Sequence, residues 1–107
     1  NKKLASMDME ERYRLIISTI LNAIGCQVEV EHMLSTGRID IVASTSRFIY
    51  VVELKLSNNG GINAAEKQII DNGYLKPFLA DDRKVIGLAV ELDDMGKGLI
   101  DWKEVQN

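Results

Sequence analysis

Residues 47–56 read Arg-Phe-Ile-Tyr-Val-Val-Glu-Leu-Lys-Leu, and this stretch decides the fold of the chain. A run of aromatic and β-branched residues, bounded by a Ser-rich turn and an Asn/Gly-rich turn, predicts a β-strand. Both faces of this strand begin apolar, which is typical of a central strand covered on both sides. One face, however, ends in Glu53 and Lys55. Buried charge costs free energy unless it is paired, hydrogen-bonded or bound to a metal, so this strand end is a candidate functional site.

The composition limits the classes of protein that the chain can represent. It has 107 residues, 46% hydrophobic residues and a formal net charge of -3, which predicts a single domain over residues 1–107 with a small core. We find no apolar run that could span a bilayer and no signal-peptide stretch. The lone Cys26 favours a reducing cytoplasm. Because the chain begins with Asn1 rather than Met, we expect a fragment of a longer protein. The mild acidity argues against an extensive nucleic-acid surface, which is usually basic.

A first helix is predicted over residues 7–24. Ser6 and Asp8 are both candidate N-caps, and Gly25 is a natural stop. Apolar residues at helical spacing should pack this helix against the sheet: Tyr13, Ile16, Ile17, Ile20, Leu21 and Ile24.

Three strands joined by short turns are predicted next, at residues 27–34, 38–43 and 47–56, and they form an antiparallel meander. In the middle strand Asp40 should lie on the face opposite to three apolar residues, since side chains alternate along a strand: Ile39, Ile41 and Ala43.

The second half of the chain predicts a βαβ unit and an edge strand. A helical pattern covers residues 62–72, and residues 85–90 are almost wholly apolar, as in a buried parallel strand. Residues 98–105 predict the closing edge strand. The order helix, three strands, helix, two strands therefore predicts an α/β fold, with a mixed five-stranded sheet between helices in three α/β/α layers.

Asp40, Glu53 and Lys55 form the candidate site. Because Asp40 and Glu53 lie on neighbouring strands joined by a short turn, their carboxylates should come close together. Two such carboxylates repel unless one is protonated or a cation bridges them, and oxygen ligands of this kind suit Mg²⁺ or Mn²⁺. Lys55 would hold an attacking water or stabilise charge on a phosphoryl oxygen. Together these groups predict metal-dependent phosphodiester hydrolysis.

Three segments carry a resemblance to a known family. Gly37-Arg-Ile-Asp40, Val52-Glu-Leu-Lys55, and Ala65-Glu-Lys-Gln-Ile69 followed by Tyr74 resemble the motifs of the PD-(D/E)XK nuclease superfamily. Within it, the chain resembles the nuclease-like domain at the C-terminus of bacterial AAA-ATPase-like proteins over nearly its whole length. One position departs from the motif, because Ile39 stands where the leading proline would be.

The resemblance implies a core of the restriction-endonuclease type and a role for each motif residue. It implies that Asp40 and Glu53 bind the metal with help from the carbonyl of Leu54. It implies that Lys55 assists the attacking water.

The resemblance also implies residues outside the two strand motifs. Gln68 would reach the site from the second helix, and an acid of the first helix, Glu11 or Glu10, would support the metal. Glu31 matches a further acid whose role stays open. The implied setting is a bacterial cytoplasm, a DNA substrate with RNA still open, a homodimer, and an ATPase-like region preceding this domain.

Other interpretations stay open beside this one. Asp40 and Lys55 taken alone would be a cross-strand ion pair of little energy, His32 is more typical of a surface residue, and Trp102 of a core plug. Tyr74 would serve as a core or cap residue as readily as a site residue. A solvated helix face would account for the basic residues near the start: Lys2, Lys3, Arg12 and Arg14. Two other functions remain, a nuclease-derived module that binds nucleic acid or a partner protein without cutting, and a structural oligomerisation domain.

Overall fold

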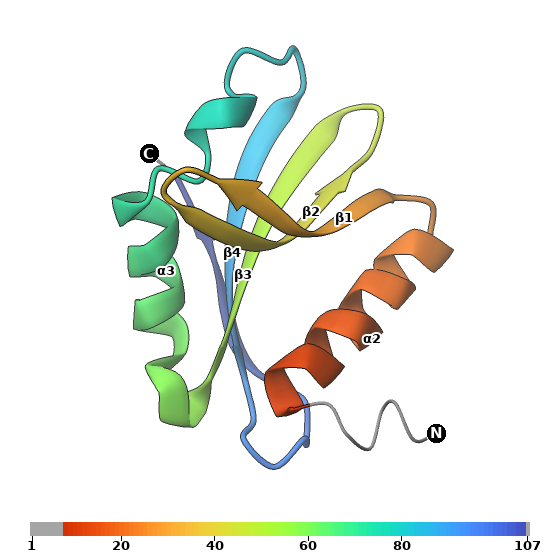
Figure 1. Ribbon diagram of the computed structural model, residues 1–107. Coiled ribbons are helices and arrows are strands. Elements are labelled where there is room, and N and C mark those ends of the chain that lie inside the picture. Colours follow the sequence, from red (N-terminus) through yellow and green to blue (C-terminus); the bar gives the residue numbers. More distant parts are fainter. Residues whose placement is uncertain (1–7, 107) are drawn as a thin grey trace.

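A mixed five-stranded sheet lies between two helices in the computed structural model, which describes residues 8–106 (Figure 1). The elements follow in the order α2 (Met9–Ala23), β1 (Gln27–Leu34), β2 (Gly37–Ser44), β3 (Phe48–Leu56), η1 (Ser57–Asn59), α3 (Gly61–Asp71), η2 (Lys76–Phe78), β4 (Lys84–Leu92) and β5 (Leu99–Val105). The strands lie in the order β1-β2-β3-β4-β5. The β3–β4 pair is parallel and the other pairs are antiparallel. These findings confirm the predicted α/β fold, its meander and its βαβ unit.

Helix α2 begins where the sequence predicts a cap. The Asp8 side chain accepts a hydrogen bond from the Glu11 backbone N–H at 2.8 Å, which satisfies one of the N–H groups that a helix start leaves unpaired. The helix ends before Gly25, whose φ of 106° lies in a region that glycine adopts without strain. The other candidate cap, Ser6, and the predicted start at residue 7 lie outside the described residues.

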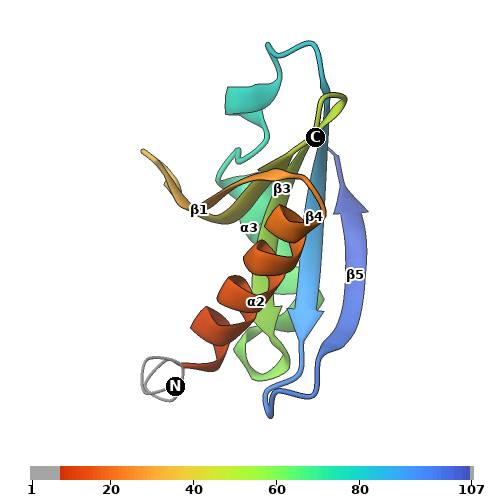
Figure 2. The same ribbon diagram turned by 90° about the vertical axis from the view of Figure 1, so that its right-hand side faces the viewer.

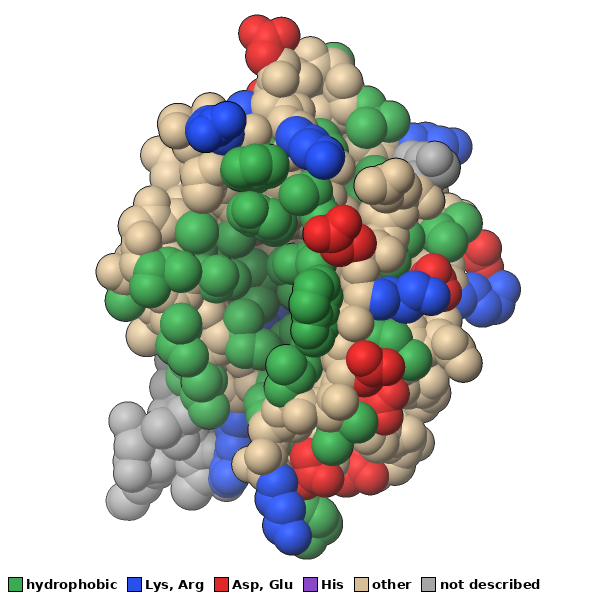
Figure 3. Space-filling view, turned by 180° about the vertical axis from the view of Figure 1, so that it is seen from behind, with side chains coloured by type: hydrophobic (Ala, Val, Ile, Leu, Met, Phe, Trp, Pro, Cys, Tyr) green, Lys and Arg blue, Asp and Glu red, His purple; other side chains and the backbone are tan. Residues whose placement is uncertain are grey.

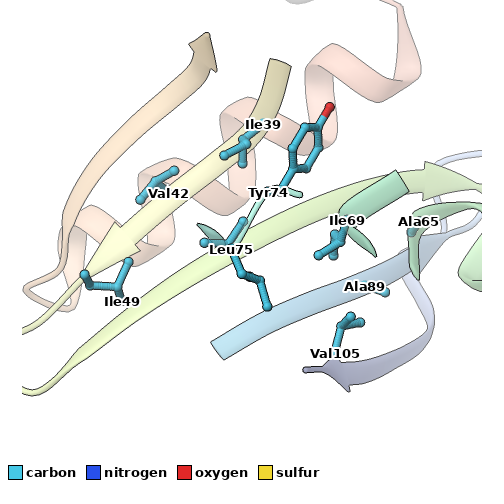
Figure 4. Packing of buried hydrophobic residues seen from close by; sticks show 10 residues of the cluster. Ile39, Val42, Ile49, Ala65, Ile69, Tyr74, Leu75, Ala89 and Val105 are labelled. Atoms are coloured by element: carbon cyan, nitrogen blue, oxygen red, sulfur yellow. The ribbon is translucent and has the colours of Figure 1, made fainter. Parts of the chain in front are cut away.

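The alternation of β3 builds one hydrophobic cluster on each face of the sheet. Ile49 and Val51 belong to the cluster under α3, and Val52 and Leu54 to the cluster under α2. Figure 4 shows the first cluster, in which Tyr74 joins residues of the strands and α3. The sheet is therefore covered on both faces, and the predicted three layers are present.

Helix α2 buries less of its apolar surface than the sequence predicts. Tyr13, Ile17 and Leu21 pack against the sheet, but Ile16 and Ile20 are exposed, as is Ile24 just beyond the helix. The reason is the position of α2, which lies against β1, β2 and β3 rather than across the whole sheet (Figure 2). Apolar side chains consequently gather on the face of the molecule shown in Figure 3.

Two predictions about the burial and the facing of side chains are wrong. Trp102 is 56% exposed rather than a core plug, because it lies on the edge strand β5, which α2 does not cover. Ile39 packs in the cluster under α3, whereas Ile41 and Ala43 pack in the cluster under α2. The alternation of β2 is thus interrupted between Ile39 and Ile41, at Asp40.

The interruption in β2 coincides with an irregularity in its neighbour β1. The β1–β2 pairing joins Val30 to Ile41 and His32 to Ile39, and it skips Glu31 and Asp40. Glu31 has a φ of 54°, which is unusual for a residue that carries a Cβ. A helix long and apolar enough to cross a membrane does not occur among residues 8–106.

Candidate active site

The candidate site lies where β2 and β3 separate. Their pairing runs from Ser44 opposite Ile49 to Ile41 opposite Val52 and ends there. Beyond that point, hydrogen bonds between side chains and backbone N–H groups connect the two strands in place of backbone–backbone hydrogen bonds. Oδ2 of Asp40 accepts from the Leu54 backbone N–H at 2.8 Å, and the Asp40 N–H donates to Oε1 of Glu53 at 3.4 Å.

The carboxylates of Asp40 and Glu53 are both buried. The exposed fraction is 6% for Asp40 and 2% for Glu53. The Leu54 N–H fixes one oxygen of Asp40, so the orientation of that side chain is set by the backbone of the neighbouring strand. The two acids that the sequence places on adjacent strands are therefore brought together on one side of the sheet.

A polar pocket of about 370 Å³ opens onto these carboxylates. Its walls come from the start of α2, from β2 and β3, and from α3 with the turn after it. The lining residues are Asp8, Glu10, Glu11, Arg14, Gly37, Arg38, Asp40, Glu53, Lys55, Gln68, Asn72 and Tyr74. All the side chains that the sequence analysis assigns to the site lie among them.

Burial, and after it the negative charge of Asp40, raises the pKa of Glu53 to about 8, although the ammonium of Lys55 opposes the shift. At neutral pH the Glu53 carboxyl therefore carries a proton unless another cation balances the pair. A divalent cation would take the place of that proton.

The donors present fit Mg²⁺ or Mn²⁺. Among residues 8–106 there is no group of three acidic, His or Cys side chains arranged around one point. Mg²⁺ does not need one, because it keeps several waters and binds through one or two carboxylates. The buried pair of Asp40 and Glu53 meets that requirement.

The structure distinguishes the two acids of the first helix. Burial raises the pKa of Glu10, and the charge of Asp40 raises it too, while Lys55 and Arg14 lower it. Glu10 therefore interacts with the charged centre of the site. Glu11 lines the pocket but is exposed. Of the two candidates left open by the sequence, Glu10 is the one that is partly buried and whose pKa the charge of Asp40 raises.

Gln68 and Tyr74 form one wall of the pocket. The Gln68 amide donates to Oη of Tyr74 at 3.1 Å, and the Tyr74 hydroxyl donates to the Arg38 carbonyl at 3.2 Å. Tyr74 is fully buried, so it serves both as a core residue and as the support of Gln68. Gly37 leaves room for this contact, since a Cβ at Gly37 would lie 2.5 Å from the Tyr74 hydroxyl.

Sequence reasoning did not assign Arg14 to the site. Its guanidinium contacts Glu31 at 2.6 Å and Asp40 at 3.3 Å. The signal was present in the spacing, because Arg14 lies four residues after Glu10 and so on the same side of α2. Basic residues commonly follow an acidic first turn in a helix. The spacing alone therefore did not distinguish an arginine that points into the site from one that is solvated.

A mixed sheet between two helices, with buried carboxylates and a lysine where two strands separate, is consistent with a nuclease-like domain. The chain belongs to the PD-(D/E)XK nuclease superfamily, whose family model matches residues 8–102. No curated protein matches the chain. Nucleases of this superfamily generally use divalent metals, which agrees with the donors at Asp40 and Glu53.

Proposed function

We propose that this domain hydrolyses phosphodiester bonds in DNA with Mg²⁺ or Mn²⁺ held by Asp40 and Glu53. The observation that carries the proposal is the buried carboxylate pair, in which Glu53 has a pKa raised to about 8. Such a pair is costly as two bare anions and is stabilised by a cation. Membership of a nuclease superfamily supports the same reaction class.

A bound divalent ion supplies Lewis-acid activation of water and phosphate. The chain's own residues prepare the site for it. Asp40 is held by the Leu54 N–H, and Glu53 would have to be ionised to hold the ion. We assign the Leu54 carbonyl, which is adjacent to the held N–H, as a further metal ligand.

Lys55 is proposed as the residue that orients the attacking water and stabilises charge on the phosphoryl oxygens. Its place in the pocket and its effect on the pKa of both Glu10 and Glu53 support this role. Glu10 is proposed to bind a water of the ion rather than the ion itself. Gln68, supported by Tyr74, is proposed to contact the substrate backbone.

A cleavage assay tests the proposal. Supercoiled plasmid and single-stranded DNA are incubated with the protein and Mg²⁺ or Mn²⁺, and RNA serves as a further substrate. We expect cleavage by the wild type, none by Asp40→Ala, and wild-type activity in the exposed control Asp82→Asn. Equal activity of wild type and Asp40→Ala would exclude catalysis at this site.

The proposal extends to the setting of the domain. We propose a homodimer, because two paired sites would let the protein cut both strands of a duplex. We propose an ATPase-like region elsewhere in the full-length protein and a bacterial cytoplasmic location; the free, half-buried Cys26 is compatible with a reducing compartment. Analytical ultracentrifugation tests the first point, and a monomer at every concentration would remove the pairing from the proposal.

A further inference from the structure

An arginine from α2 reaches the centre of the candidate site. The side chain of Arg14 is only 12% exposed, and its guanidinium contacts two carboxylates. The contact with Glu31 is short, at 2.6 Å, whereas the contact with Asp40 is 3.3 Å. Arg14 therefore lies between a buried carboxylate, Asp40, and a more exposed one, Glu31, which it approaches more closely.

The backbone of β1 is distorted at the residue that holds Arg14. Glu31 has a φ of 54°, a left-handed conformation that a residue with a Cβ adopts at a cost in free energy. The β1–β2 pairing skips this residue and Asp40 opposite it. Strain of this kind persists where the surrounding structure requires it, and it is frequent at functional sites.

The charges around Arg14 also indicate a ligand. The pocket presents the carboxylates of Glu10, Asp40 and Glu53, so an anionic substrate needs cationic groups to enter it. A guanidinium carries five N–H donors, more than two carboxylate contacts require, and its planar shape matches a phosphate group. Arg14 lies beside the carboxylate proposed to hold the ion, where the phosphate would also be placed.

We propose that Arg14 binds the substrate phosphate and that Glu31 is a positioning residue that holds Arg14 for this purpose. This inference rests on the proposed function, since the phosphate belongs to the same substrate. When Asp40 carries the ion, a phosphate oxygen replaces Asp40 as the partner of Arg14. The contact with Glu31 is kept and fixes the direction of the guanidinium.

DNA binding measured at several salt concentrations tests this role. Fluorescence anisotropy of a labelled duplex is followed with Ca²⁺ in place of Mg²⁺, which keeps oxygen ligands on a hard cation. We expect Arg14→Gln to weaken binding by about tenfold to a hundredfold, the value of a hydrogen bond to a charged group. The slope of log K against log salt should also become shallower by about one, because one phosphate contact is lost.

Three matched variants separate phosphate binding from a structural ion pair. Arg47→Gln removes the same charge at the opposite end of β3 and should leave affinity and slope unchanged. Arg14→Lys should keep the slope, since the charge remains, but bind more weakly because the planar fork is lost. Glu31→Gln should weaken binding less than Arg14→Gln does. Far-UV circular dichroism and thermal unfolding confirm that each variant is folded.

The outcomes distinguish this inference from the proposed function. If folded Arg14→Gln binds the duplex with wild-type affinity and slope, or if the wild type binds no duplex, Arg14 is not a phosphate ligand. If the wild type binds DNA through Arg14 but cleaves nothing with Mg²⁺ or Mn²⁺, the inference stands and the nuclease proposal fails.

Discussion

Without a divalent ion, the stability of this protein should fall as the pH rises through neutrality, and Glu53 should be the main cause. The pKa of its carboxyl rises from 4.5 to about 8 on folding, first because it is buried and then because Asp40 lies beside it. The folded state therefore binds this proton more tightly than the unfolded state does. The stabilisation is fully present below the unfolded pKa and is lost as the pH rises through the folded pKa.

The size of the effect follows from the shift. Each pH unit between the two pKa values changes the free energy of unfolding by about 1.4 kcal/mol. Between about pH 5 and about pH 7 the wild type should thus lose roughly 3 kcal/mol through this group. That is a large part of the total stability of a domain of this size. Glu53→Gln has no proton to lose there and should lack this slope.

Urea unfolding in EDTA measures the effect. The free energy of unfolding is determined at several pH values for the wild type, for Glu53→Gln and for the exposed control Glu104→Gln. The difference between wild type and Glu53→Gln removes the contribution of the titrating groups that do not interact with Glu53. It should change steadily with pH, while the control should follow the wild type. Parallel curves for wild type and Glu53→Gln would refute a protonated, buried Glu53.

Three further predictions concern Glu31 and two residues that line the pocket, Gly37 and Tyr74. Glu31→Gly should be more stable than Glu31→Ala by about 1 kcal/mol, because both variants lose the carboxylate but only glycine adopts the left-handed φ without strain; urea unfolding that ranks Ala equal or higher would contradict the strain. Gly37→Ala should lower the free energy of unfolding by about 2 kcal/mol, since its Cβ would meet the Tyr74 hydroxyl at 2.5 Å, and an unchanged melting temperature would contradict this close approach. Tyr74→Phe should lower the free energy of unfolding by about 1 to 2 kcal/mol, because it removes the donor to the Arg38 carbonyl and the acceptor for Gln68. An unchanged free energy of unfolding would show that water replaces these hydrogen bonds.

The fold was predictable from the sequence because its central strand is locally consistent. The alternation of residues 48–56 assigns Val51 and Val52 to opposite faces, and the structure buries both there. The short turns of the meander and the apolar strand β4 then leave few topologies. Asp40 and Glu53 lie one residue pair beyond the end of the β2–β3 pairing, so their closeness could be predicted from the sequence by extending that register.

Other features depend on tertiary geometry that periodicity does not contain. A helical stripe shows that Ile16 and Ile20 are apolar, but it does not show how far the sheet extends beneath them. The left-handed backbone at Glu31 could not be predicted, because a glycine, which usually marks such a position, is absent there. The position is occupied instead by the residue that holds Arg14. The identity of the first-helix acid depends on the side of α2 that faces Asp40, and adjacent residues such as Glu10 and Glu11 point in different directions.

Titration calorimetry with Mn²⁺ tests the central claim most directly. We predict that the wild type binds Mn²⁺ and that, at about pH 7, binding releases about one proton, because Glu53 must ionise to become a ligand. The proton is detected by repeating the titration in buffers with different enthalpies of ionisation. Asp40→Ala should not bind the ion. Wild-type protein that takes up no Mn²⁺, or Asp40→Ala that binds it equally well, would contradict a shared metal site at these two carboxylates.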